Sequence, residues 1–93
     1  MRVCINAIHC YLLIYILDYD FERLFNTQCS HGKNSFDTLE HAKDNCKANG
    51  QCIGVFQKNC TDDKKYYECS KNATIISNIQ IEGCIYKKFS IGK

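Results

Sequence analysis

The segment DTLEHAKDNCKANGQCIGVFQ, residues 37–57, decides the fold. Asp37 can cap a helix, and Glu40 follows three positions later, as a capping box requires. The apolar side chains then recur at spacings of three and four, which places them on one helix face: Leu39, Ala42 and Cys46. Asn49-Gly50 tolerates the left-handed backbone at which many helices end. The segment therefore predicts a helix over residues 38–48.

The residues after this helix are rich in β-forming side chains separated by turn signals. Gln51–Gln57 predicts a strand, and Gly54 inside it predicts a bulge or the close approach of another element. A turn-rich stretch at 58–65 leads to a second strand, which gives a hairpin with a long loop. This second strand is expected at 66–69, and further strands are expected at 74–81, 83–89 and 21–29. We therefore predict an α+β fold with one helix packed on a small curved antiparallel sheet.

Cysteine is abundant, with eight residues in a chain of 93. Six of them lie downstream of the apolar N-terminal stretch: Cys29, Cys46, Cys52, Cys60, Cys69 and Cys84. A domain of about seventy residues buries too little apolar surface for a comfortable stability margin, and disulfides supply the deficit in secreted proteins. We therefore predict three disulfides. Cys46 and Cys52 both point toward the expected core, and bonds from them to the hairpin cysteines would join helix to sheet, but spacing alone does not choose the pairing.

The N-terminal stretch VCINAIHCYLLIYIL, Val3–Leu17, has a basic residue before it and acidic residues after it. Its length is that of a signal-peptide core and falls short of the roughly 20 residues of a membrane span. We predict that residues 1–20 are a cleaved secretory signal, with the boundary between 17 and 27, and that residues 21–93 are secreted without a membrane span. Cys4 and Cys10 then have no structural role. The alternatives are an uncleaved anchor, or an internal strand or helix of a longer chain.

Several other classes of function are not predicted. The net charge of +2 is too mild for a nucleic-acid binder. No C-x2-C motif is present and only His31 and His41 lie near the six downstream cysteines, so neither a zinc site nor thioredoxin-like chemistry is expected, and no cofactor is implied. Cys29, two positions before His31, is expected to be bonded rather than nucleophilic. Asp62-Asp63 and Glu68 fit a solvated loop better than an acid-base pair. No enzymatic activity is predicted.

Two triplets fit the acceptor pattern for N-glycosylation. Asn72-Ala73-Thr74 lies between two predicted strands, and we expect Asn72 to be modified in a secreted chain. Asn59-Cys60-Thr61 also fits, but a disulfide at Cys60 would restrict access to Asn59.

Two basic pairs lie near aromatic residues and form a candidate contact set for a ligand: Lys64, Lys65, Tyr66, Lys87 and Lys88. Positive charge beside aromatic rings attracts sulfated glycans and acidic proteins. Lysines on the solvent face of strands, above half-buried tyrosines, are also ordinary, and we favour this structural interpretation.

Residues Ser35–Lys88 resemble a PAN/apple domain, a small extracellular module. The motifs that carry the resemblance are the helix with Ala42-Lys43 and Cys46, the sequence NGQCIGVF at 49–56, Cys60, Cys69, and GCIYKK at 83–88. They cover a little over half of the chain. The resemblance implies nested disulfides that join Cys29 to Cys84, Cys46 to Cys69, and Cys52 to Cys60.

The resemblance also implies a function in binding. It predicts a secreted module that recognises an extracellular protein or a carbohydrate through loops and an exposed sheet face. The alternative is a cysteine-rich secreted effector, toxin-like or protease-inhibiting, for which Asp62–Lys65 is the candidate inhibitory loop.

Overall fold

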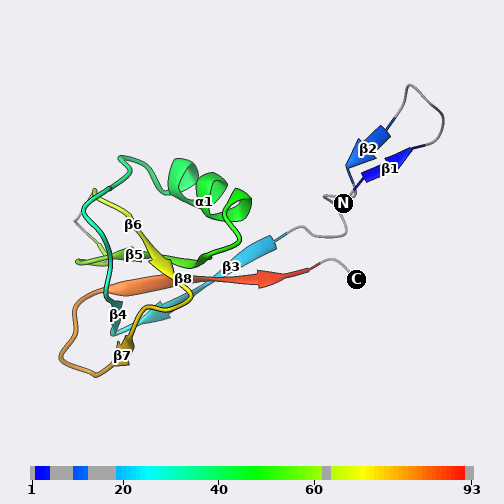
Figure 1. Cartoon of the computed structure of the whole chain (residues 1–93). Helices are drawn as coiled ribbons and strands as arrows, with labels where there is room; N and C mark the ends of the chain where they lie inside the picture. Colours follow the sequence, from blue (N-terminus) through cyan, green and yellow to red (C-terminus); the bar gives the residue numbers. More distant parts are fainter. Residues whose placement is uncertain (1, 5–9, 13–18, 62–63, 92–93) are drawn as a thin grey trace.

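The computed structural model describes residues 2–4, 10–12, 19–61 and 64–91 (Figure 1). Its elements, in chain order, are β1 (Arg2–Cys4), β2 (Cys10–Leu12), β3 (Tyr19–Phe25), β4 (Thr27–Cys29), α1 (Leu39–Ala48), β5 (Cys52–Gln57), β6 (Tyr67–Ser70), β7 (Ile75–Ser77) and β8 (Cys84–Ser90). One helix packs on antiparallel sheets with three disulfides, so the predicted α+β class is confirmed.

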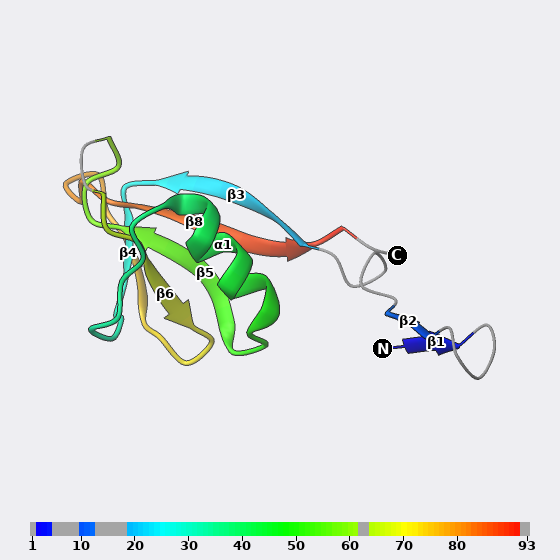
Figure 2. The same ribbon diagram turned by 90° about the horizontal axis from the view of Figure 1, so that it is seen from above.

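The central sheet has four strands in the order β3-β8-β5-β6, and every neighbouring pair is antiparallel. β4 pairs with β7, and β1 pairs with β2, in separate two-stranded sheets. The helix α1 lies along one face of the central sheet, and β4 and β7 lie toward the other face (Figure 1). Seen from above, α1 lies over β5 and β8 (Figure 2).

The start of α1 differs by one residue from the prediction. Its N-cap is Thr38, not Asp37: Thr38 has an extended backbone and its side chain accepts a hydrogen bond from the backbone N–H of His41. The capping residue accepts from the third residue of the helix, and a threonine does this as an aspartate does. The expected box between Asp37 and Glu40 is therefore replaced by a cap at Thr38, and Glu40 keeps a favourable place in the first turn.

The end of α1 does not use the left-handed backbone predicted at Asn49-Gly50. Asn49 is the C-cap, with φ −109° and ψ 106°, and its backbone N–H donates to the carbonyl of Cys46. Among the described non-glycine residues, positive φ occurs at Asn26 and at no other position. The chain instead leaves the helix in an extended conformation and enters β5 at Cys52 within three residues.

Gly54 confirms the predicted irregularity of its strand. The pairing of β5 with β6 shifts register between Cys52 and Gly54. A Cβ atom at Gly54 would lie 2.9 Å from the carbonyl oxygen of Tyr86 and 3.1 Å from Cγ2 of Ile85. Glycine is therefore required because β8 approaches β5 closely here.

Two predicted strands are shorter or divided. The stretch 21–29 forms β3 and β4, which are separated at Asn26, where φ is 58° and the side chain donates to the carbonyl of Ile81 at 2.9 Å. The stretch 74–81 forms only β7, because Asn78 turns the chain by accepting bonds from the backbone of Gln80 and Ile81.

The sheet has a core on each face. The core beneath α1 consists of Ala42, Cys46, Cys52, Val55, Cys84 and Tyr86. The core on the opposite face consists of Cys29, Phe56, Cys69 and Ile85. Alternate residues of a strand point to opposite faces, so Val55 and Tyr86 belong to the first core while their neighbours Phe56 and Ile85 belong to the second.

The six cysteines named above form three disulfides, but the pairing differs from the nested pattern. The bonds join Cys29 to Cys69, Cys46 to Cys52, and Cys60 to Cys84. The difference arises because the cysteines lie on different faces of the central sheet. Cys69 and Cys29 share the core opposite the helix, whereas Cys46 and Cys84 lie in the core beneath it, so neither Cys46–Cys69 nor Cys29–Cys84 is accessible. Cys60 lies beside Cys84 because its N–H bonds the carbonyl of Glu82, so Cys60 does not pair with Cys52.

The predicted signal lies mostly outside the described residues and stays a prediction. Within residues 1–20 the structure describes β1, β2 and the first two residues of β3. β3 begins at Tyr19, where it pairs with Ser90, so the sheet starts two residues before the predicted domain boundary. In the described ranges, no helix has the length and hydropathy needed to cross a membrane.

Candidate functional site

The predicted contact set of lysines and Tyr66 does not form one surface. Lys64 and Lys65 are exposed before β6, and Tyr66 is half-buried, bridged to Phe36 and packed against the helix-side core. Lys87 is exposed on the sheet face opposite the helix, across from Glu22. The positions of Lys64, Lys65 and Lys87 are those of ordinary solvent-exposed lysines.

Lys88 points to the helix side of the sheet and binds the C-terminal end of α1. Its Nζ donates to the carbonyl oxygens of Cys46 at 2.7 Å and Asn49 at 3.1 Å, and it lies 4.6 Å from the ring centroid of Tyr19. Partial burial lowers the pKa of the Lys88 ammonium, and the Glu68 carboxylate partly offsets this by raising it. A cation at the C-terminal end of a helix satisfies carbonyls that lack helical partners.

A polar hollow of about 250 Å³ lies between the end of α1 and β6. The side chains that define it are four carboxamides, one carboxylate and one ring: Asn34, Asn45, Asn49, Gln51, Glu68 and Phe36. We call it the Glu68 cleft. None of these carboxamides was assigned to a binding site from the sequence. Asn45 and Asn49 are four residues apart at the end of the helix, so their side chains are neighbours on its surface. This spacing is the sequence feature that could have indicated the cleft.

Glu68 is the organising residue of the cleft. Its Oε2 accepts from Nδ2 of Asn45 at 2.7 Å, and its Oε1 accepts from Nδ2 of Asn49 at 3.1 Å. The side chain of Asn49 is itself held, because its Oδ1 accepts from the backbone N–H of Gln51 at 3.0 Å. Each carboxylate oxygen keeps acceptor capacity for a ligand, since an ionised carboxylate offers about four lone-pair sites.

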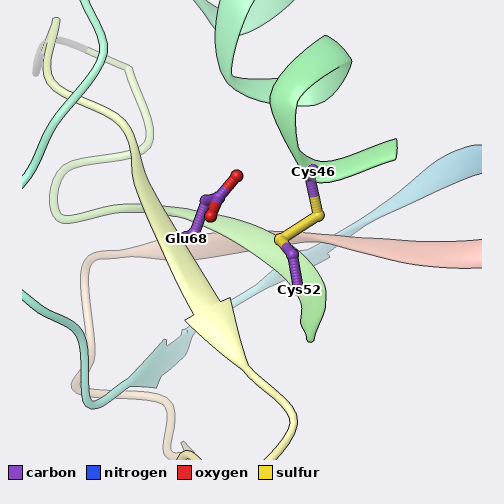
Figure 3. Close-up of side chains that lie close together, drawn as sticks. All are labelled: Cys46, Cys52 and Glu68. Atoms are coloured by element: carbon purple, nitrogen blue, oxygen red, sulfur yellow. A yellow bond between two sulfur atoms is a disulfide. The ribbon is translucent and has the colours of Figure 1, made fainter. Parts of the chain in front are cut away.

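The Cys46–Cys52 disulfide lies beside Glu68. Figure 3 shows Glu68 projecting from β6 toward the helix end, with the disulfide joining the last turn of α1 to the start of β5. The two sulfur atoms and a Glu68 carboxylate oxygen all lie within 4.8 Å of one another. With both sulfurs bonded to each other, this cluster is not a metal site in the oxidised protein.

The other predicted site residues are placed as follows. Asn72 and Thr74 are exposed in the turn between β6 and β7, and Asn59 is half-buried, with its Oδ1 accepting from both the N–H and the hydroxyl of Thr61. The sulfur of Cys29 is bonded to Cys69, so it is not a nucleophile beside His31. Asp62 and Asp63 lie outside the described residues, so the proposed inhibitory loop is described only at Lys64 and Lys65.

A second hollow, of about 600 Å³, lies on the other side of the molecule and is lined in part by His31, Phe56 and Lys58. The ring of His31 lies 4.0 Å from that of Tyr67, centroid to centroid, and its Nδ1 contacts the carbonyl of Gly32 at 2.6 Å. These contacts explain His31 as part of the packing around the second core.

Comparisons of the chain with protein-family models, with curated proteins and with solved structures find no match.

Proposed function

We propose that the chain is a secreted, disulfide-stabilised binding module of PAN/apple-like type that recognises a carbohydrate through the Glu68 cleft. The observation that carries this is the pre-oriented carboxylate: Glu68 is held by Asn45 and Asn49 in a hollow that opens to solvent. Binding groups fixed before the ligand arrives lose less conformational entropy on binding.

The chemistry of the cleft suits hydroxyl groups. The free lone pairs of Glu68 accept from ligand hydroxyls, and carboxamides such as those of Asn34 and Gln51 both donate and accept. Phe36 supplies an apolar wall for the carbon face of a ring. The volume of about 250 Å³ is just below the range of about 300–1,000 Å³ of pockets for drug-sized ligands, which fits a single sugar unit.

The charge of the cleft favours a neutral sugar over a sulfated one. Glu68 is the charged side chain that lines it, and neither lysine pair does. An anionic ligand would meet a carboxylate without an opposing cation among the lining residues.

Secretion and the PAN/apple-like affiliation are supported by separate features. Three disulfides in a small domain are typical of proteins that fold in oxidising compartments. The affiliation rests on the order of a helix ending near Cys46, a strand with Cys52 and Gly54, and the final strand from Cys84, and it does not rest on the disulfide pairing.

The test is a glycan array with neutral, sialylated and sulfated members, followed by calorimetry on the neutral sugars that bind. We expect Glu68→Gln to weaken binding about tenfold or more and Asn34→Ala about fivefold, since a hydrogen bond to a charged group contributes about 1.5–3 kcal/mol and a neutral one about 1. Lys87→Ala and Lys64→Ala are the matched controls and should bind as the parent does. An array on which only sulfated glycans bind, or no glycan at all, rejects the proposal.

A further inference from the structure

We propose that Cys46, Cys52 and Glu68 form a site for a thiophilic divalent cation such as Zn²⁺ when the Cys46–Cys52 disulfide is reduced. In the oxidised state the same three side chains leave the Glu68 cleft free of metal. The inference is independent of the carbohydrate proposal, because it concerns the reduced form and needs no sugar.

The three ligand atoms already lie close together. All are within 4.8 Å of one another. A tetrahedral zinc ion with Zn–S of about 2.3 Å and Zn–O of about 2.1 Å places its ligand atoms roughly 3.6–3.8 Å apart. Opening the disulfide lets the sulfurs separate from bonding distance by side-chain rotation, while the Cα atoms stay near their present 5.2 Å.

Glu68 is oriented as a metal ligand requires. Asn45 and Asn49 donate one hydrogen bond to each of its oxygens. Hydrogen-bond partners of this kind fix the direction of a coordinating carboxylate. Their removal typically lowers metal affinity by about 10–100-fold. The carboxylate is thus fixed by residues that do not themselves depend on the disulfide.

Two other disulfides and the hydrogen bonds of Lys88 hold the fold together when the Cys46–Cys52 bond opens. Cys46 and Cys52 are six positions apart, compared with 40 for Cys29–Cys69 and 24 for Cys60–Cys84. A short loop contributes least to the chain entropy that a cross-link removes. Lys88 also holds the carbonyls of Cys46 and Asn49, so the helix end remains tied to β8.

Charge and access complete the site. Two thiolates and a carboxylate around a dication leave one negative charge, and the Lys88 ammonium lies next to the helix end to balance it. Cys46 and Cys52 are almost fully buried, but Cys52 and Glu68 both line the cleft, so a fourth coordination position would face the cleft.

The chemical steps balance as follows. A thiol or phosphine reductant supplies two electrons, the S–S bond breaks, and each sulfur takes a proton. Binding of the cation then releases those two protons as the sulfurs coordinate as thiolates. With a thiol reductant, two thiols supply the protons and become a disulfide. With a phosphine, water supplies the protons and its oxygen forms the phosphine oxide.

The experiment uses the purified, folded chain. Mild phosphine treatment is used to open the Cys46–Cys52 bond, and the phosphine is then removed. Alkylation and peptide mapping of a separate aliquot check that the other two disulfides persist. Co²⁺ is then titrated without oxygen, and the thiolate charge-transfer and tetrahedral visible bands report coordination. The variants are Glu68→Gln and the milder Asn45→Ala, and the control is Glu82→Gln, which removes an exposed carboxylate elsewhere.

We expect one Co²⁺ per chain in the reduced protein and no thiolate band in the oxidised protein. Glu68→Gln should weaken Co²⁺ binding at least tenfold and Asn45→Ala by a smaller factor, whereas Glu82→Gln should match the parent. Equal affinity in the parent, Glu68→Gln and Asn45→Ala overturns the proposal, as does the absence of a thiolate band. Opening of all three disulfides together overturns it as well, because the frame then depends on this bond.

Discussion

The ammonium of Lys88, near the end of the chain, donates a 2.7 Å hydrogen bond to the carbonyl oxygen of Cys46 in the last turn of α1. The neighbouring residue Lys87 points to the other face of the sheet and is exposed. Two adjacent lysines that look alike in the sequence therefore have different roles. Lys88 caps the helix, and Lys87 contacts solvent.

Replacing Lys88 by methionine should lower the free energy of unfolding by about 1–2 kcal/mol. The change keeps the aliphatic stem but removes two hydrogen bonds from a charged donor and the favourable interaction with the helix end. Lys87→Met is the matched control and should change it by less than about 0.5 kcal/mol. Urea unfolding followed by circular dichroism measures both values, and equal effects of the two changes would show that Lys88 is not a helix cap.

The pH dependence of stability should carry a signature of Lys88. Its pKa in the folded protein is lowered from 10.5 because burial disfavours the charged form, and Glu68 opposes the shift. Between the lowered pKa and 10.5, the unfolded chain therefore binds more protons at Lys88 than the folded chain does. The contribution of Lys88 to the free energy of unfolding rises with pH across this window, and it is lost as the pH falls through the folded pKa.

NMR titration of the Lys88 side chain in the parent and in Glu68→Gln measures the shift directly. Removing the carboxylate removes the influence that raises the pKa, so the pKa of Lys88 should fall further in the variant. An unchanged Lys88 pKa in Glu68→Gln would contradict the influence assigned to the Glu68 carboxylate.

Gly54→Ala should destabilise the protein by about 1–3 kcal/mol, the usual cost of overpacking. The new Cβ would meet the backbone oxygen of Tyr86 at 2.9 Å, and backbone atoms in a sheet have little room to move. Gly50→Ala is the control because nothing lies within 4 Å of a Cβ there. Thermal unfolding of the two variants compares them, and a Gly54→Ala protein as stable as Gly50→Ala would argue against the close contact of β5 and β8.

Expression in a secreting eukaryotic host should attach one glycan, at Asn72. Asn72 and Thr74 are exposed in a turn, whereas Asn59 is half-buried beside the Cys60–Cys84 disulfide. Intact mass should therefore fall by one glycan in Asn72→Gln and stay unchanged in Asn59→Gln. Loss of the glycan in Asn59→Gln instead would reverse the assignment.

The helix and the strands that follow it could be predicted because their signals are local. Helix periodicity placed α1 within one residue, and Gly54 marked the bulge in β5. The cap at Thr38 was missed because adjacent Asp37 and Thr38 are both good capping residues and only the backbone conformation selects between them. The extended exit at Asn49 was missed because Lys88, a residue distant in sequence, completes the helix end.

The disulfide pairing and the cleft could not be predicted because both depend on which sheet face a residue occupies. Cys69 lies opposite the helix and Glu68 lies on the helix side, although they are adjacent in the sequence. A register shift in β5 also changes which of its residues point to each face. Glu68 therefore meets Cys46 and Cys52 only after three elements have packed together.

Non-reduced tryptic mapping tests the central claim most directly, because both the Glu68 cleft and the proposed metal site require Cys46 and Cys52 to lie side by side next to Glu68, paired with each other in the oxidised protein. Lysines and Arg23 place each of the six cysteines in its own peptide: 24–33, 44–47, 48–58, 59–64, 66–71 and 72–87. We predict that peptide 44–47 is joined to 48–58, 24–33 to 66–71, and 59–64 to 72–87. A bond between 44–47 and 66–71, as the nested pairing requires, would contradict the account.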